Sequence, residues 1–160
     1  MRPAPFLSRR AALGVAFGAT ASLLPRGEAV AGAAPIYTRR FGGLGLNGHD
    51  PVAHVALGEP AEGSRRFSTR WNGATWRFVS ADNRDAFAAD PARYAPRYGG
   101  YCAWATARGY LAPGDPRFWR VVDGGLYVNY DGDVQLAWEK DIPGFIRSAD
   151  ANWPSILEKG

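Results

Sequence analysis

Three side chains in this 160-residue chain could bind a soft or borderline metal ion: Cys102, His49 and His54. The only methionine is Met1, so a copper or zinc site would have to use these three residues. One thiolate with two imidazoles suits copper, and a low coordination number would favour Cu(I), with zinc as the second choice. The spacing alone does not bring the three side chains together, so a packed thiol and two polar rings remain the alternative.

Other chemistry is less well supported. Cys102 with His49 and Asp50 permits a cysteine-hydrolase hypothesis, in which an imidazole generates the thiolate, but no motif for an oxyanion hole accompanies them. The acidic run 129–133 begins like a calcium loop, yet Val134 stands where that loop needs glycine. We therefore predict a non-catalytic protein and interpret this run as a turn and a helix cap.

Four aromatic residues near the cysteine form a second candidate site. They are Tyr98, Tyr101, Trp104 and Tyr110. They could line a pocket for a small ligand or a surface for a partner, although aromatic residues beside glycine bends are more often part of a core. A ligand-binding or interaction module without metal is therefore the alternative function, and it predicts an apolar concavity with Cys102 away from both histidines.

The elements that must position these residues follow from local patterns. Asp50-Pro51 predicts the start of a short helix over 51–57, and Asn72-Gly73 predicts a hairpin between strands 66–71 and 74–79. Ser80 or Asp82 can cap a helix that runs to residue 89. A second short helix at 91, a hairpin around 121–130 and helices over 134–140 and 144–157 complete the prediction. No internal repeat is evident in the sequence, and the predicted class is α+β, with hairpins forming an antiparallel sheet packed by short helices.

The N-terminus has the pattern of an export signal. Arg9-Arg10 precede an uncharged stretch over 11–25, and the small residues 31–33 resemble a signal-peptidase site. Paired arginines before a diluted apolar core are typical of the twin-arginine pathway. We expect a signal peptide over 1–33, a linker over 34–45 and one domain over 46–158, located in the periplasm or another extracytoplasmic space, with the twin-arginine translocase as a partner during export.

Charge excludes other partners. The net charge of +4 includes the arginines of the signal, and the mature domain is close to neutral. A neutral surface offers no footprint for nucleic acid or anionic lipid. The apolar stretch is also too short for a membrane span, so no membrane attachment is expected after cleavage. With a single cysteine, the chain cannot form an intrachain disulfide.

Several motifs together resemble exported YHS-domain proteins. They are Asn47-Gly-His-Asp-Pro-Val-Ala-His54, Trp71-Asn-Gly-Ala-Thr-Trp76, Ser80-Ala-Asp-Asn-Arg84, Phe87-Ala-Ala-Asp-Pro91, Tyr94-Ala-Pro96, Tyr98-Gly-Gly-Tyr-Cys-Ala103, Asp123-Gly124, Leu126-Tyr127, Asn129, Ala149-Asp150 and Trp153-Pro154. This resemblance covers roughly residues 46–157. It implies a small α+β module that binds metal, often copper, and that could serve a metal-trafficking partner. His49 and His54 depart from the family pattern, which has tyrosine at both positions.

Overall fold

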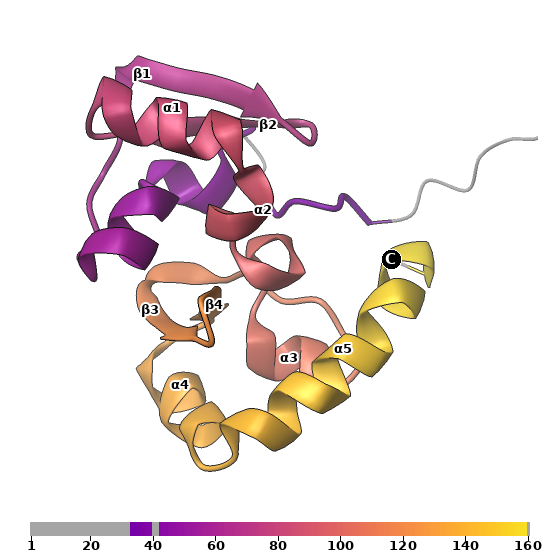
Figure 1. The fold of residues 1–160 in the computed structure, drawn as a ribbon. Coiled ribbons are helices and arrows are strands. Elements are labelled where there is room, and N and C mark those ends of the chain that lie inside the picture. The colour runs from indigo at the N-terminus through magenta and orange to yellow at the C-terminus, as the bar shows by residue number, and fades with distance from the viewer. Residues whose placement is uncertain (1–32, 40–41, 160) are drawn as a thin grey trace, which may run out of the picture.

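The computed structural model describes residues 33–39 and 42–159, and these form two β-hairpins surrounded by helices (Figure 1). The strands are β1 (Ser64–Trp71), β2 (Ala74–Phe78), β3 (Asp115–Val122) and β4 (Gly125–Asn129). The helices are α1 (Ala81–Ala89), α2 (Pro91–Tyr94), α3 (Ala103–Ala107), α4 (Gly132–Glu139) and α5 (Ile142–Lys159). Short 3₁₀ turns occupy Gly45–Gly48 and Arg97–Gly100, and Ala53–Leu57 form a π-helical turn. None of the helices in these ranges is both long and apolar enough to span a bilayer.

The α+β class predicted from the sequence is confirmed. The hairpin around Asn72-Gly73 has its predicted position, and Ser80 caps α1 by accepting a hydrogen bond from the backbone of Asn83. Within the described ranges the hairpins are two separate two-stranded sheets. Strand β3 begins at Asp115, earlier than expected, because Gly114 and Pro116 indicated a loop there, and α3 was not predicted.

The chain contains an internal structural repeat that was not evident in the sequence. Each repeat unit begins with a 3₁₀ turn in which three consecutive residues have positive φ angles, and these turns are 52 residues apart. The residues are Leu46, Asn47 and Gly48 in the first turn and Tyr98, Gly99 and Gly100 in the second. Such a run is rare in proteins. We call residues 45–89 the first half and residues 97–139 the second half.

The two hairpins repeat the same irregular pairing. In the first half, the register shifts between the pairs Ser64–Phe78 and Ser68–Arg77. In the second half, it shifts between Asp115–Asn129 and Trp119–Val128, each residue lying 51 positions further along the chain. Both turns are also of one kind, because Asn72-Gly73 and Asp123-Gly124 all have positive φ angles.

The helix after each hairpin is held in the same way. Ser80 Oγ accepts from the backbone N–H of Asn83 at 3.1 Å, and Asp131 Oδ1 accepts from that of Val134 at 2.9 Å. An aromatic pair then joins hairpin to helix in each half. The ring centroids of Trp76 and Phe87 are 5.1 Å apart in the first half, and those of Tyr127 and Trp138 are 5.6 Å apart in the second. Turn, hairpin, cap and aromatic pair therefore occur twice in the same order.

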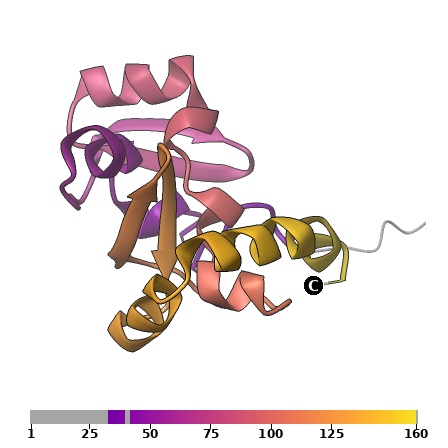
Figure 2. The ribbon, with the colours of Figure 1, turned by 60° about the horizontal axis from the view of Figure 1, so that its bottom comes forward.

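Two hydrophobic clusters follow from this arrangement. One centres on Trp76, Phe78 and Phe87 in the first half, and Leu126 and Val128 of β4 extend it into the second. The other centres on Tyr127 and Trp138 and is covered by α5, which runs alongside α3 (Figure 2). Because β4 is buried along its whole length, it contributes to both clusters and joins the halves into one core.

The segment expected to be a linker packs on the domain. Ile36 is 5% exposed and belongs to the first cluster. The backbone N–H of Tyr37 donates to the carbonyl of Gly99 at 2.9 Å, and that of Ala33 donates to Leu157 near the end of α5, also at 2.9 Å. The predicted signal, apart from Ala33, lies outside the described residues.

The buried carboxylate of Asp50 organises the first half. Its side chain is fully buried and accepts four hydrogen bonds. Three come from the backbone N–H groups of Val52 at 2.8 Å, Ala53 at 3.1 Å and Val79 at 2.9 Å, and the fourth from Asn83 Nδ2 at 2.7 Å. Four hydrogen-bond donors therefore compensate the carboxylate for the water it loses. A charged group can be buried at a small cost in free energy only when it is paired in this way.

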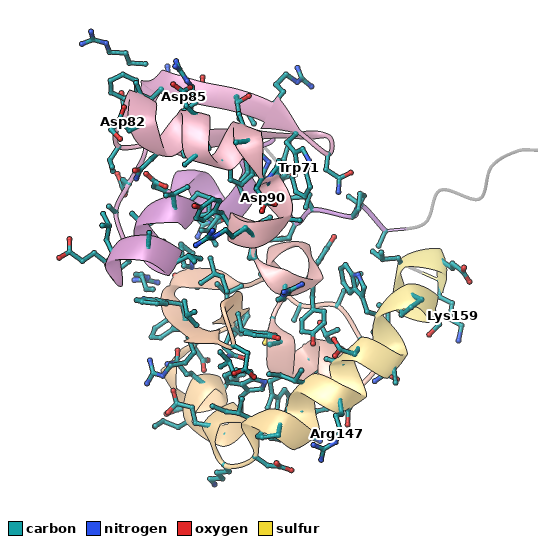
Figure 3. The ribbon with its side chains drawn as sticks, viewed as in Figure 1. Trp71, Asp82, Asp85, Asp90, Arg147 and Lys159 are labelled. Atoms are coloured by element: carbon teal, nitrogen blue, oxygen red, sulfur yellow. The ribbon has the colours of Figure 1, made fainter. Side chains whose placement is uncertain are left out.

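We expect Asp50→Ala to lower the free energy of unfolding by about 3–5 kcal/mol, because four buried donors lose their acceptor together. Urea denaturation followed by circular dichroism measures this loss. Asp85→Ala is the matched control, since Asp85 lies on α1 with its side chain 65% exposed (Figure 3). A loss for Asp50→Ala no larger than that for the control would contradict the structural role of this carboxylate.

Candidate functional site

Cys102 stands at the equivalent of Asp50 in the second half. It lies two residues after the turn Arg97–Gly100 and is the N-terminal flanking residue of α3. The residue is 1% exposed, and its Sγ donates a long hydrogen bond of 3.7 Å to Asn129 Oδ1. Its backbone N–H donates to Ala112 at 2.9 Å, as that of Asp50 donates to Ala61 at the same distance. The position of the thiol is thus set by the same turn and the same backbone hydrogen bond that position Asp50.

A small apolar concavity of about 230 Å³ opens beside this thiol. Its lining comes from α3, from the loop after α3 and from the start of α4. The lining residues are Cys102, Trp104, Ala105, Tyr110, Ala112, Tyr130 and Val134. Tyr110 and Tyr130 are 47% and 54% exposed, so they form the rim of the concavity, whereas Cys102 forms part of its buried wall.

Burial raises the pKa of the Cys102 thiol above its ordinary value. Interactions of the sulfur with the backbone N–H groups of Ala105, Tyr130 and Trp104 lower the pKa but do not offset the burial. The neutral thiol is therefore the dominant form at neutral pH. A buried neutral thiol is a weak nucleophile and has to lose its proton before it can ligate a metal ion.

His54 is completely buried and holds two parts of the fold together. Its Nδ1 lies 2.8 Å from the carbonyl oxygen of Asp50 in its own turn, and its Nε2 lies 3.0 Å from that of Pro116 in β3. The ring also packs edge-on against Trp119, with centroids 5.1 Å apart. A carbonyl oxygen can only accept, so an imidazolium ring makes both hydrogen bonds and a neutral ring makes one. Both nitrogens face the protein backbone, which leaves neither directed toward a metal ion.

His49 lies in a polar cleft of about 300 Å³, separate from the concavity. The cleft is lined by Arg39, Asn47, His49, Glu62, Asp115, Pro116 and Arg117. His49 Nδ1 is buried without a hydrogen-bond partner, and the ring lies edge-on to that of His54 with centroids 6.2 Å apart. Burial lowers the pKa of His49, and repulsion from His54 adds to this effect, while Glu62 and Asp115 oppose it.

The three residues predicted as metal ligands are therefore divided between different surroundings. His49 lies in the polar cleft, His54 in the core between the halves, and Cys102 beside the apolar concavity, which neither histidine lines. Within residues 33–39 and 42–159, no three His, Cys, Asp or Glu side chains are grouped so that they could share a metal ion. The residues as arranged do not fit a joint copper or zinc centre, and metal binding stays a prediction of the sequence.

The four aromatic candidates have two different settings. Tyr98 is 7% exposed and donates through its hydroxyl to Asp150 at 2.8 Å, while Tyr101 donates to the carbonyl of Ala34 at 3.0 Å. Both rings pack against Trp153 of α5. Trp104 and Tyr110, by contrast, line the concavity, and the guanidinium of Arg108 lies 4.0 Å from the Trp104 ring centroid.

Sequence reasoning missed Asn129 and Tyr130 as neighbours of the thiol. Asn129 is fully buried, its Oδ1 accepts from the backbone N–H of Trp104 at 3.2 Å, and its Nδ2 has no hydrogen-bond partner. The signal that could have found them is the repeat itself. Asn72-Gly73 and Asp123-Gly124 are two turn dipeptides 51 residues apart, and this spacing aligns Cys102 with Asp50 to within one position.

Comparison with known proteins gives no match: no protein-family model, no curated protein and no solved structure is similar to this chain. The resemblance to exported YHS-domain proteins accordingly stays a prediction.

We expect acidification to destabilise the fold through His49. Its pKa is lowered in the folded protein, whereas in the unfolded chain it lies near about 6.5. The unfolded chain therefore binds the proton first, and stability is lost as the pH falls from about 6.5 toward the lowered value. Urea denaturation at about pH 7.5 and about pH 5 should show a smaller loss for His49→Gln than for the parent.

Glu62→Gln is the opposing control for this prediction. Glu62 raises the pKa of His49, so its removal should lower that pKa further and enlarge the acid-induced loss of stability. Equal losses in the parent and in His49→Gln would show that His49 does not carry the effect.

Proposed function

We propose that the mature chain is an exported, non-catalytic binding module whose concavity beside Cys102 takes one small uncharged ligand. The observation that carries this proposal is the concavity itself. It is apolar and flanked by two exposed tyrosines, and it stands apart from both histidines. This is the arrangement that the alternative function without metal predicts.

The size and lining of the concavity define the ligand class. A volume of about 230 Å³ lies below the roughly 300–1,000 Å³ typical of sites for drug-sized molecules. A single ring or a short aliphatic group fits such a space. The lining carries no ionised side chain, so a charged ligand would lose hydration without gaining a partner. The ligand is accordingly small, apolar and neutral.

The rim supports binding rather than simple packing. Tyr110 and Tyr130 hold large apolar rings partly in water, beside a site where those rings can stack on a ligand. The wall behind them is rigid, because Cys102 and Ala105 are buried and belong to the repeated turn and helix. A rigid wall with an aromatic rim binds a ligand with little ordering cost.

Export is the second part of the proposal. Arg9-Arg10 and the uncharged stretch that follows support passage through the twin-arginine translocase and a periplasmic or other extracytoplasmic location. Ile36 is buried in the core and the backbone N–H of Tyr37 donates to Gly99, so the segment after the proposed cleavage site belongs to the folded domain.

Metal handling with copper or zinc remains the competing proposal, supported by the residue types and by the resemblance. It would require His49 and Cys102 to approach each other, and His54 to give up hydrogen bonds to the Asp50 and Pro116 carbonyls. The arrangement of the side chains favours the binding module.

We expect toluene to bind in the concavity and benzoate, of similar size but charged, to bind much more weakly. Backbone amide NMR shifts at Ala105, Tyr110 and Tyr130 should titrate with toluene at about millimolar Kd or tighter. Val134→Phe fills the concavity and should weaken binding at least about tenfold. Leu136→Phe is the control on the same helix, since Leu136 is 63% exposed and lies outside the lining. Shifts that ignore Val134→Phe would overturn the proposal.

We expect a Cu(I) titration of the mature protein to show no stoichiometric site that depends on both Cys102 and His49. The reason is that these side chains lie in different cavities. Competition with a chromogenic chelator measures the affinity in the parent, in Cys102→Ser and in His49→Ala. A tight one-to-one site lost in both variants would favour metal handling instead.

A further inference from the structure

The internal repeat makes the surroundings of Cys102 equivalent to those of Asp50. In the first half, the Asp50 carboxylate accepts from the backbone N–H groups of Val52, Ala53 and Val79. The equivalent residues in the second half are Trp104, Ala105 and Tyr130. Backbone N–H groups of these same three residues lower the pKa of the Cys102 thiol, and that of Trp104 also donates to Asn129 Oδ1 at 3.2 Å. Equivalent backbone N–H groups thus bind a carboxylate in one half and lie near a thiol in the other.

A second observation concerns Asn129. It is fully buried, its carboxamide faces the sulfur through Oδ1 at 3.7 Å, and its Nδ2 has no partner. In the first half, the fourth donor to the anion is a side-chain amide, Asn83 Nδ2, whose equivalent position holds Val134. Rotation of the Asn129 carboxamide by half a turn would present its free Nδ2 toward Cys102 and would release the backbone N–H of Trp104 from Oδ1. The site therefore contains one more buried donor than a thiol can use.

We propose that Cys102 is a site of oxidation by peroxide and that its sulfinate is held as the Asp50 carboxylate is held. A cysteine sulfinate places two oxygens on the atom next to Cβ, as an aspartate carboxylate does. It is also ionised at neutral pH. Its oxygens would accept from the backbone N–H groups of Trp104, Ala105 and Tyr130 and from the Asn129 amide. A neutral thiol cannot accept hydrogen bonds from all of these donors.

The oxidant reaches the sulfur through the apolar concavity, part of whose wall is Cys102. In the first step the thiol loses its proton to solvent, the resulting thiolate Sγ attacks one oxygen of hydrogen peroxide, the O–O bond breaks, and the departing hydroxide takes up a proton to form water. This leaves a sulfenic acid. A second peroxide molecule oxidises the sulfur again with release of water, and the resulting sulfinic acid loses its proton to solvent. With one cysteine in the chain, no internal thiol can divert the sulfenic acid into a disulfide.

The proposal uses the concavity as an entrance and does not depend on an apolar ligand binding there. A failure of toluene to bind would leave it unchanged. Loss of the oxidation site would equally leave the binding module unchanged.

The first test compares two substitutions of nearly equal shape. Cys102→Asp supplies an anion to the three backbone donors, whereas Cys102→Asn supplies a neutral amide whose NH₂ group opposes some of them. We expect the folded-to-unfolded ratio of Cys102→Asp at neutral pH to exceed that of Cys102→Asn by about tenfold, because charge-assisted hydrogen bonds are the stronger. Urea denaturation measures both. A less stable Cys102→Asp would overturn the proposal.

The second test uses the parent protein and needs no variant to fold. Mature protein is treated with graded hydrogen peroxide, and intact mass spectrometry follows the gain of two oxygen atoms, with dimedone trapping the sulfenic acid. We expect the doubly oxidised form to accumulate at Cys102 and to keep the denaturation midpoint of the reduced protein. Peptide mapping shows that the oxygens are on Cys102 rather than on a tryptophan. Oxidation of Cys102 that unfolds the domain, or no oxidation before the tryptophans react, would refute the assignment.

Discussion

The buried carboxylate of Asp50 is the constraint around which the first half is arranged. A fully buried charge is tolerated only when donors surround it, and here the donors come from three places: the turn after Pro51, the end of β2 and the side chain of Asn83 in α1. Each donor fixes the distance between its own segment and the others. The hairpin, the helix that follows it and the 3₁₀ turn before it are consequently held in one geometry, and the aromatic core fills the space between them.

The second half keeps this geometry and replaces the anion by a thiol. Its turn, hairpin and cap are maintained by backbone conformation and by the pair Tyr127 and Trp138. Some of its buried hydrogen-bond donors have no partner. They include the indole N–H of Trp104 and the Nδ2 of Asn129. Val134 in place of an amide also makes the nearby wall apolar. The buried charge lies in the first half, whereas the concavity and the buried thiol, which could serve a ligand or an oxidant, lie in the second.

The sequence could predict those elements whose signals are local. Proline after Asp50, the Asn72-Gly73 turn and the Ser80 cap each act within a few residues, and each was located from residue type alone. The early part of β3 and helix α3 were not predicted, because glycine and proline near Gly114 indicate a loop and because five residues are too few for a helical period. Residue types alone also suggested that Cys102, His49 and His54 bind one metal ion. Their separation depends on tertiary packing across 48–53 residues of chain, which no local pattern encodes.

His54 shows why the repeat matters for interpreting single residues. Taken alone, a buried histidine near another histidine resembles a ligand. Its equivalent in the second half is Thr106, whose hydroxyl donates to the carbonyl of Cys102 at 2.9 Å, just as His54 Nδ1 meets the carbonyl of Asp50. Both side chains therefore satisfy the carbonyl four residues earlier in their turn. The imidazole is longer than the threonine side chain, and its second nitrogen reaches Pro116 in β3, so it also joins the two halves. The two hydrogen bonds of His54 are enough to explain why its ring is buried between the halves, without a metal ion.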